Sequence, residues 1–195
     1  MDAKGHPQRP LERSSLPIER ITDAFLAETK EESPELYKYL GHLDAQGRLE
    51  LGGVLGRFDF RHKGELDAEQ RLMARRVLGR LHRPATSMLV LVNRVLDYLD
   101  LNNNALLEPD EVELCVEIFE LFAHADSDND TVSEHELELL YAAIRQMDRD
   151  DNHALDALER RELREALQNP KAFLERQRLR NPRVAELMRS RSPSS

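Results

Sequence analysis

Two twelve-residue stretches, DLNNNALLEPDE at 100–111 and DRDDNHALDALE at 148–159, share one pattern of side chains. In both, residues with a side-chain oxygen stand at the first, third, fifth, ninth and twelfth places, and a leucine stands at the eighth. Calcium takes about six to eight oxygen ligands, and a late glutamate can supply two oxygens at once. The shared pattern therefore predicts that each stretch wraps around a hard cation, with Ca²⁺ favoured.

A third frame of the same length, DFRHKGELDAEQ at 59–70, extends the repeat toward the N-terminus. Its leucine and late carboxylate keep their places, but Arg61 and Lys63 stand third and fifth, and Gln70 stands twelfth. We expect the loop shape to persist here while its cation site is lost. Residues 47–50, GRLE, look like a still fainter copy. The repeated order is more informative than one motif, because a chance acidic loop would not carry the same leucine and carboxylate.

The two full stretches resemble the EF-hand, the helix–loop–helix calcium module of the calmodulin superfamily, over roughly residues 86–168. In the first loop the resemblance implies ligands from Asp100, Asn102, Asn104, the backbone carbonyl of Leu106, Glu108 and a bidentate Glu111. In the second loop it implies ligands from Asp148, Asp150, Asn152, the carbonyl of Ala154, Asp156 and Glu159. It also implies that Leu107 and Leu155 point into the core and let the two loops pair through a short strand contact.

The sixth place departs from the resemblance, because the family has glycine there and this chain has Ala105 and His153. A residue with a Cβ in the left-handed region costs about 1–2 kcal/mol. We therefore expect calcium binding on the order of micromolar or looser. The second loop carries more carboxylates, so we expect it to fill first, with Mg²⁺ as a possible competitor.

A third acidic loop, ADSDNDTVSEHE at 125–136, lies between the two. Counting forward from its first aspartate and backward from its last glutamate gives frames that differ by one residue, so ion binding here stays open. Helices that run up and down place successive loops at opposite ends. We expect the 100–111 and 148–159 loops to pair and this one to lie at the far end, with a pairing of 100–111 and 59–70 as the alternative. Its candidate ligands are Asp126, Asp128, Asp130, Val132 and Glu136.

The same loops can also be read as solvated acidic turns, because Asp and Asn are common at helix starts. Two matches that share their late leucine and glutamate weigh against that interpretation. The seven histidines do not predict a zinc site, because no cysteine cluster or His pair on one helix face accompanies them. No phosphate-cradling glycine loop or nucleophile elbow is present, so we predict no enzyme.

Helical periodicity between these loops predicts an all-α fold. We expect a disordered tail at 1–16, a helical region with the vestigial loop at 17–85, the calcium-binding region at 86–168 and a basic amphipathic tail at 169–195. Short helices are expected after Asn169-Pro170 and Asn181-Pro182. The main helices are expected at about 18–29, 33–40, 67–81, 86–99, 109–124, 133–147 and 157–168.

Charge is divided unevenly along the chain, whose formal net charge is −9. Residues 100–159 carry 18 acids against two arginines, a charge of −16, whereas residues 160–195 carry nine arginines and one lysine against four glutamates, a charge of +6. The tail predicts either a partner-binding helix, for a protein target or docked on the acidic loops of the same chain, or an ordinary closing helix packed on the domain with its arginines in water. Nucleic acid and membrane are the less favoured partners. Its candidate contact residues are Phe173, Leu174, Arg176, Arg180, Arg183 and Leu187.

The lone cysteine, Cys115, rules out an internal disulfide and fits a reducing compartment. The first ten residues contain no apolar segment, and the longest apolar run is too short to cross a bilayer, so we expect a cytoplasmic protein. The leading hypothesis is a calcium sensor or buffer. The alternative is a non-catalytic scaffold whose loops have decayed and which acts through its basic C-terminal helix.

Overall fold

The computed structural model describes residues 15–61, 63–124, 130–169, 172–173 and 175–176. It confirms the all-α prediction, because the described residues form eight helices and no strand. Seven of the eight lie where the periodicity predicts them. Their bounds are α1 Ser15–Glu32, α2 Pro34–Leu40, α3 Ala45–Arg57, α4 Ala68–Leu78, α5 Thr86–Leu99, α6 Pro109–Ala123, α7 Glu134–Met147 and α8 Ala157–Leu167.

Helix α3 is the element that periodicity misses, and the interpretation of residues 47–50 as a faint loop is wrong. The Asp44 side chain accepts a hydrogen bond from the Gly47 N–H and so begins the helix before this segment. The glycines that follow allow close packing instead of ending the helix. A Cβ at Gly52 would lie 2.3 Å from the Ile18 side chain, so this glycine lets α1 approach α3.

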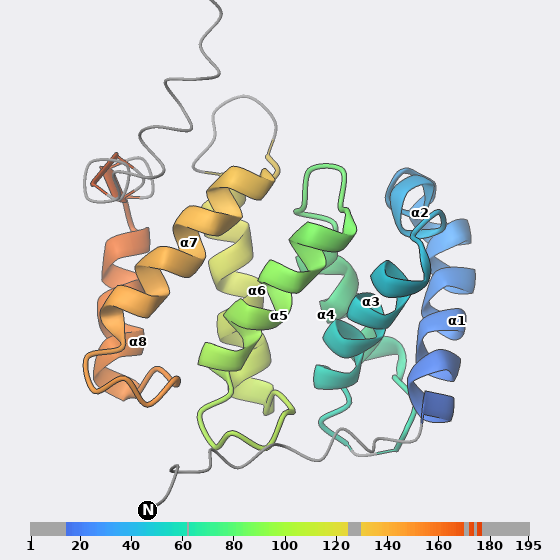
Figure 1. Ribbon diagram of the computed structural model, residues 1–195, viewed down its shortest axis with the longest axis horizontal. Helices are drawn as coiled ribbons and strands as arrows, with labels where there is room; N and C mark the ends of the chain where they lie inside the picture. The colour runs from blue at the N-terminus through green and yellow to red at the C-terminus, as the bar shows by residue number, and fades with distance from the viewer. Residues whose placement is uncertain (1–14, 62, 125–129, 170–171, 174, 177–195) are drawn as a thin grey trace, which may run out of the picture.

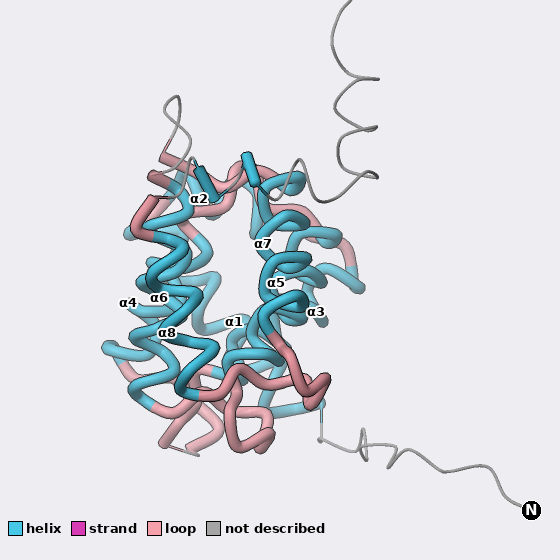
Figure 2. Tube along the Cα trace, turned by 90° about the vertical axis from the view of Figure 1, so that its left-hand side faces the viewer, coloured by secondary structure: helices cyan, strands magenta, loops and turns pink. Residues whose placement is uncertain are grey.

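Three helical hairpins stand side by side in the fold. Helices α3 and α4, α5 and α6, and α7 and α8 are each joined by one of the twelve-residue frames. Helix α5 packs between α3 and α7, and α6 packs between α4 and α8, so the hairpins form two layers (Figure 2). The connecting frames all lie at one end of the molecule, and α1 and α2 cover the side of the row next to α3 (Figure 1). The repeat in sequence is therefore a repeat in space.

One apolar core runs through the row of hairpins. The eighth-place leucines Leu107 and Leu155 are buried in it, as predicted, and Leu66 of the vestigial frame is buried there as well. Since α3 packs on α5, the core is continuous across the expected boundary between 17–85 and 86–168. None of the described helices has the length and apolarity needed to cross a membrane.

Residues 130–136, the described part of the third acidic loop, lie at the opposite end from the three frames, as predicted (Figure 1). This part joins the turn between α4 and α5 through an isolated bridge between Leu81 and Val132. The His82 N–H donates to the Val132 carbonyl at 2.9 Å. This end of the molecule is thus closed by backbone hydrogen bonds between two turns.

Candidate metal centre

The backbone makes the same sharp turn in all three frames. The sixth residue has a positive φ in each, 69° at Gly64, 66° at Ala105 and 64° at His153. The fourth residue repeats this in the two full loops, with 54° at Asn103 and 55° at Asp151. The expected left-handed conformation at Ala105 and His153 is therefore confirmed. The vestigial frame has the glycine that suits this turn, and the two full loops do not.

A buried aspartate at the first place organises each loop from inside. Its two carboxylate oxygens accept the backbone N–H groups of the fifth and sixth residues. In the second loop Asp148 accepts from Asn152 at 3.1 Å and from His153 at 3.0 Å. Burial raises the pKa of the Asp148 carboxyl, but hydrogen bonds from these N–H groups and from neighbouring side chains together hold its pKa below the ordinary value. Asp100 accepts from Asn104 at 3.1 Å and Ala105 at 2.7 Å, and Asp59 from Lys63 at 3.0 Å and Gly64 at 2.7 Å.

The twelfth-place glutamates are also buried and fasten the two ends of their loops. Glu159 accepts the Arg149 N–H at 2.8 Å on one oxygen and the Asp156 N–H at 3.0 Å on the other. Glu111 is held in the same way by the N–H groups of Leu101 at 2.8 Å and Glu108 at 2.9 Å. The loops therefore keep a closed shape through their own carboxylates.

In the second loop three predicted ligands come together. Carboxylate oxygens of Asp148, Asp150 and Glu159 lie within 4.8 Å of one another, close enough to hold one metal ion. Asn152 lies beside them and donates from its side chain to Asp150 at 2.8 Å. Asp156 accepts the Glu159 N–H at 2.9 Å and so caps α8. Ala154, whose carbonyl is the remaining predicted ligand, donates its N–H to the Asn152 side chain at 2.8 Å.

The first loop brings its predicted residues into the same frame with fewer carboxylates. The Asn102 side chain accepts the Asn104 N–H at 3.1 Å, and the Asn104 side chain accepts the Leu106 N–H at 2.7 Å. The Asn104 side chain also donates to Glu108 at 3.3 Å. Asn102 and Asn103 stand here at the third and fourth places, where the second loop has Asp150 and Asp151, and the fifth place is asparagine in both loops. The first loop therefore presents less negative charge to a cation than the second.

Two arginines that the motif did not predict contact the first loop. Arg160 lies at the thirteenth place of the second frame and donates to the Leu99 carbonyl at 2.9 Å and to Glu111 at 3.2 Å. Arg57, near the end of α3, lies 3.8 Å from Asp100. Both arginines are buried. The sequence does contain a signal for the role of Arg160, because an arginine, Arg71, also occupies the thirteenth place of the vestigial frame.

The vestigial frame keeps the loop shape, as expected, and an exposed arginine of its own pairs with its acids. Arg61, at the third place, forms ion pairs with Asp67 and Glu69. The Gln70 N–H bonded to Asp67 lowers the pKa of that carboxyl most, burial opposes this effect, and the nearby Arg61 lowers the pKa further. Like Arg160 in its own loop, Arg71 donates to the carbonyl of the eighth-place leucine, here Leu66. The vestigial frame and the 148–159 frame thus share a thirteenth-place arginine as well as the eighth-place leucine.

The middle loop is described from Asp130 onward, and the candidates Asp126 and Asp128 lie outside the described residues. Asp130 has a φ of 51°, which fits the frame counted back from Glu136 because that frame puts Asp130 sixth. Its exposed carboxylate lies 3.1 Å from His124. Glu136 accepts both the N–H and the hydroxyl of Ser133, at 2.8 and 2.7 Å. The described part therefore resembles the closing half of the other loops.

The expected strand contact between the first and second loops is wrong. The Leu155 N–H donates to the Tyr98 carbonyl at 2.9 Å, and the Leu107 N–H donates to the Arg57 carbonyl at 2.8 Å. Each loop thus bonds to the end of the preceding hairpin's first helix, and the first loop has a neighbour on both sides. The physical reason is that the hairpins stack in one direction, so the two eighth-place residues do not face each other.

The described part of the tail packs on the helical body. Phe173 is buried against Phe122, with ring centroids 6.2 Å apart. This side chain closes the core, which fits the closing-helix interpretation and does not favour Phe173 as a contact for an outside partner. Arg176 is exposed. The other predicted contacts, Leu174, Arg180, Arg183 and Leu187, lie outside the described residues.

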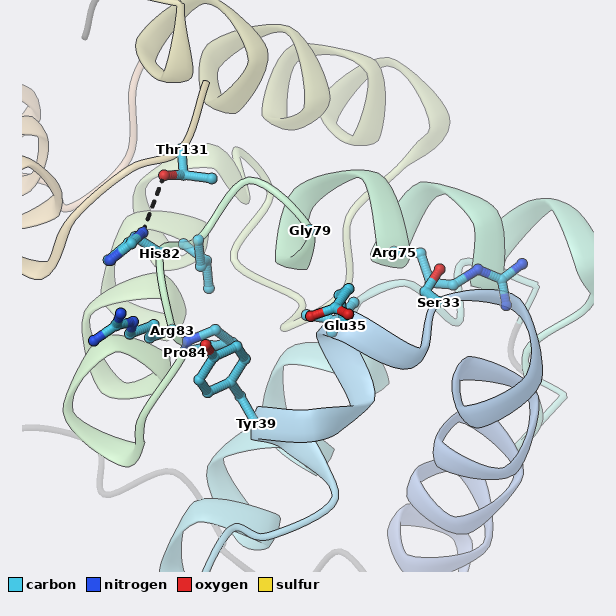
Figure 3. Close-up of a pocket in the computed structure, with 11 residues that line it drawn as sticks. Ser33, Glu35, Tyr39, Arg75, Gly79, His82, Arg83, Pro84 and Thr131 are labelled. Atoms are coloured by element: carbon cyan, nitrogen blue, oxygen red, sulfur yellow. Dashed lines mark hydrogen bonds between the residues drawn. The ribbon is translucent and has the colours of Figure 1, made fainter. Parts of the chain in front are cut away.

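One cleft lies far from the predicted ligands, and a smaller cavity lies beside the second loop. A cleft of about 370 Å³ opens at the far end of the molecule, where Tyr39 and Arg83 line it and His82 meets Thr131 (Figure 3). A smaller one, of about 180 Å³, has His153 of the second loop in its wall, beside tyrosines and arginines of α5 and α7. Neither cavity is lined by a predicted carboxylate ligand.

No protein-family model, no curated protein and no solved structure matches this chain. Functional inference therefore depends on the residues and their geometry.

Proposed function

We propose that the chain binds Ca²⁺ through the 148–159 loop and acts as a calcium sensor or buffer. The observation that carries this proposal is the approach of Asp148, Asp150 and Glu159 within one closed loop. Hard oxygen donors of this kind suit Ca²⁺, with Mg²⁺ as the natural competitor. The EF-hand resemblance supports the same assignment, since the turn at His153 follows its frame.

The hydrogen bonds of Glu159 leave its carboxylate free to coordinate an ion through both oxygens. Each of its two oxygens accepts one backbone N–H, from Arg149 and from Asp156. A carboxylate oxygen has about two acceptor sites, so one remains on each oxygen. Glu159 can therefore give both oxygens to one cation without losing the bonds that close the loop.

Calcium would act by relieving repulsion within the loop. Several carboxylates are held close together there, and a bound dication removes their mutual repulsion and so stabilises the folded loop. The chain has five methionines, and the large exposed apolar side chains of the described residues are scattered, namely Leu49, Leu72, Leu101 and Leu158. A promiscuous Met-rich groove is thus not supported, which favours a buffer or a sensor with one dedicated partner.

Calorimetric titration with Ca²⁺ tests the proposal. Glu159→Gln removes the bidentate charge while keeping the shape, and we expect it to weaken binding by at least about tenfold, the loss typical even for groups that only support a metal ligand. Glu165→Gln is the matched control, because it removes the same charge from an exposed position on α8. Absence of binding by the wild type at millimolar Ca²⁺ would refute the proposal. A competing titration with Mg²⁺ addresses the buffer role.

The second candidate is a non-catalytic scaffold that acts through its basic C-terminal helix. One observation favours it: the vestigial loop keeps its turn with Arg61 paired to its acids, so this fold does not require an ion in every loop. The same titration separates the two candidates, because a scaffold with decayed loops gives no calcium-dependent heat.

A further inference from the structure

The first loop differs from the second in having its end ligands already in contact with cations from the same protein. Arg160 reaches from the third hairpin to Glu111, and its guanidinium is held in place by the carbonyls of Leu155 and Leu99, both at 2.9 Å. Arg57 reaches from the first hairpin to Asp100. The first and last ligands of this loop are therefore each contacted by a buried positive charge.

The hydrogen bonds of Glu111 show how the contact with Arg160 reduces the number of oxygens available to a metal ion. One oxygen accepts both the Leu101 N–H at 2.8 Å and the Arg160 Nη2 at 3.2 Å, which fills its roughly two acceptor sites. The other oxygen accepts only the Glu108 N–H. Glu111 can thus offer one oxygen where Glu159 can offer two. The bidentate grip on which such loops depend is not open here.

Arg57 adds repulsion at the other end of the loop. Its Nη2 is anchored on Asp97, while its buried Nη1 has no hydrogen-bond partner and lies 3.8 Å from Asp100. A guanidinium is charged at every accessible pH and cannot withdraw by losing a proton. A dication bound to Asp100 would therefore sit beside the Nη1 edge of a fixed guanidinium, and this edge has no hydrogen-bond acceptor of its own.

We infer that Arg57 and Arg160 serve as built-in cations of the 100–111 loop, so that the chain binds one Ca²⁺, in the 148–159 loop, instead of two. This inference depends on the proposed function and specifies which site carries it. In the second loop the corresponding carboxylates have no arginine or lysine side chain as a partner among the described residues. The basic group beside them is the exposed imidazole of His153, whose Nδ1 lies 3.6 Å from Asp148 and which is charged only when protonated. Arg149 at its second place turns away instead and pairs with Glu162 through two contacts of 2.7 Å.

The number of ions bound by the full chain tests this inference by calorimetry with Ca²⁺. We expect one ion for the wild type and two for the variant that combines Arg57→Gln with Arg160→Gln. Adding Glu111→Gln to that variant should return the number to one. Arg161→Gln, an exposed neighbour on the same helix, is the control and should leave one ion bound.

A second comparison avoids the risk that the arginine variant fails to fold. In the wild-type background Glu111→Gln should leave the number of ions and their affinity unchanged, while Glu159→Gln should abolish tight binding. Two ions in the wild type, or a loss of binding on Glu111→Gln, would overturn the inference and leave the proposed function standing. A folded double variant that still binds one ion would also overturn it. No binding by the wild type would overturn both.

Discussion

Replacing Ala105 by glycine should stabilise this protein, although the same change in a helix destabilises. Ala105 has a φ of 66°, where a Cβ costs about 1–2 kcal/mol. Glycine removes that strain but adds about 0.4–1 kcal/mol of backbone entropy to the unfolded chain. The net gain is about 0.5–1 kcal/mol, or about 1–4 °C in Tm for a chain of this size.

Two matched variants give this prediction its internal standard. Gly64→Ala makes the reverse change at the sixth place of the vestigial frame, where φ is 69°. It should lower the free energy of unfolding by about as much as Ala105→Gly raises it. Ala142→Gly lies inside α7 and should lose about 1 kcal/mol. Urea unfolding followed by far-ultraviolet circular dichroism measures all three variants. The titrations are run with a chelator, because a bound ion would shift the apparent stability.

The sign of the Ala105→Gly effect decides the test. A loss of stability comparable to that of Ala142→Gly would mean that residue 105 is not held in the left-handed region. The three frames would then not share the same turn. A gain at Ala105 together with a loss at Gly64 would support the same backbone in both loops.

Two further predictions concern the helical body. Gly52→Ala should lower the free energy of unfolding in urea by about 1–3 kcal/mol, because the new Cβ would overlap Ile18. Gly53→Ala should lower it clearly less, since the nearest neighbour of its Cβ is a side-chain amide at 3.3 Å. Equal losses of stability in the two variants would contradict the close approach of α1 and α3. Burial raises the pKa of the Cys115 thiol far above its ordinary value, so iodoacetamide should modify the native protein only as fast as it unfolds, and rapid labelling without denaturant would contradict that burial.

The sequence predicts most of the helices because their apolar residues recur at helical spacing between well-marked acidic loops. Helix α5 was predicted to the residue at Thr86–Leu99. Helix α3 is not predicted because residues 47–50 resemble the loop frames, and because the glycines at 47, 52, 53 and 56 are unfavourable inside a helix. Their role is tertiary: Gly52 makes room for Ile18 on another helix, and no local pattern carries that information.

The loops were predictable in the same local sense, and their surroundings were not. The spacing of Asp148 and Glu159 within one frame is enough to place both at one closed turn. The contact between Arg160 and Glu111 joins residues 49 positions apart and depends on which hairpin stands next to which. The predicted strand contact failed for a related reason, since it assumed that the two loops face each other.

The direction of stacking explains why the three loops differ in their cations. Each hairpin bonds to the one before it, and Arg160 at the thirteenth place extends that contact to the preceding loop. The second hairpin has Val112 at its thirteenth place, so it can send no charge back to the vestigial loop, which contains Arg61 instead. The 148–159 loop belongs to the last of the three stacked hairpins, and no following hairpin among the described residues supplies an arginine to it. A repeat whose members are alike in sequence therefore yields one loop whose carboxylates stay available to an outside ion.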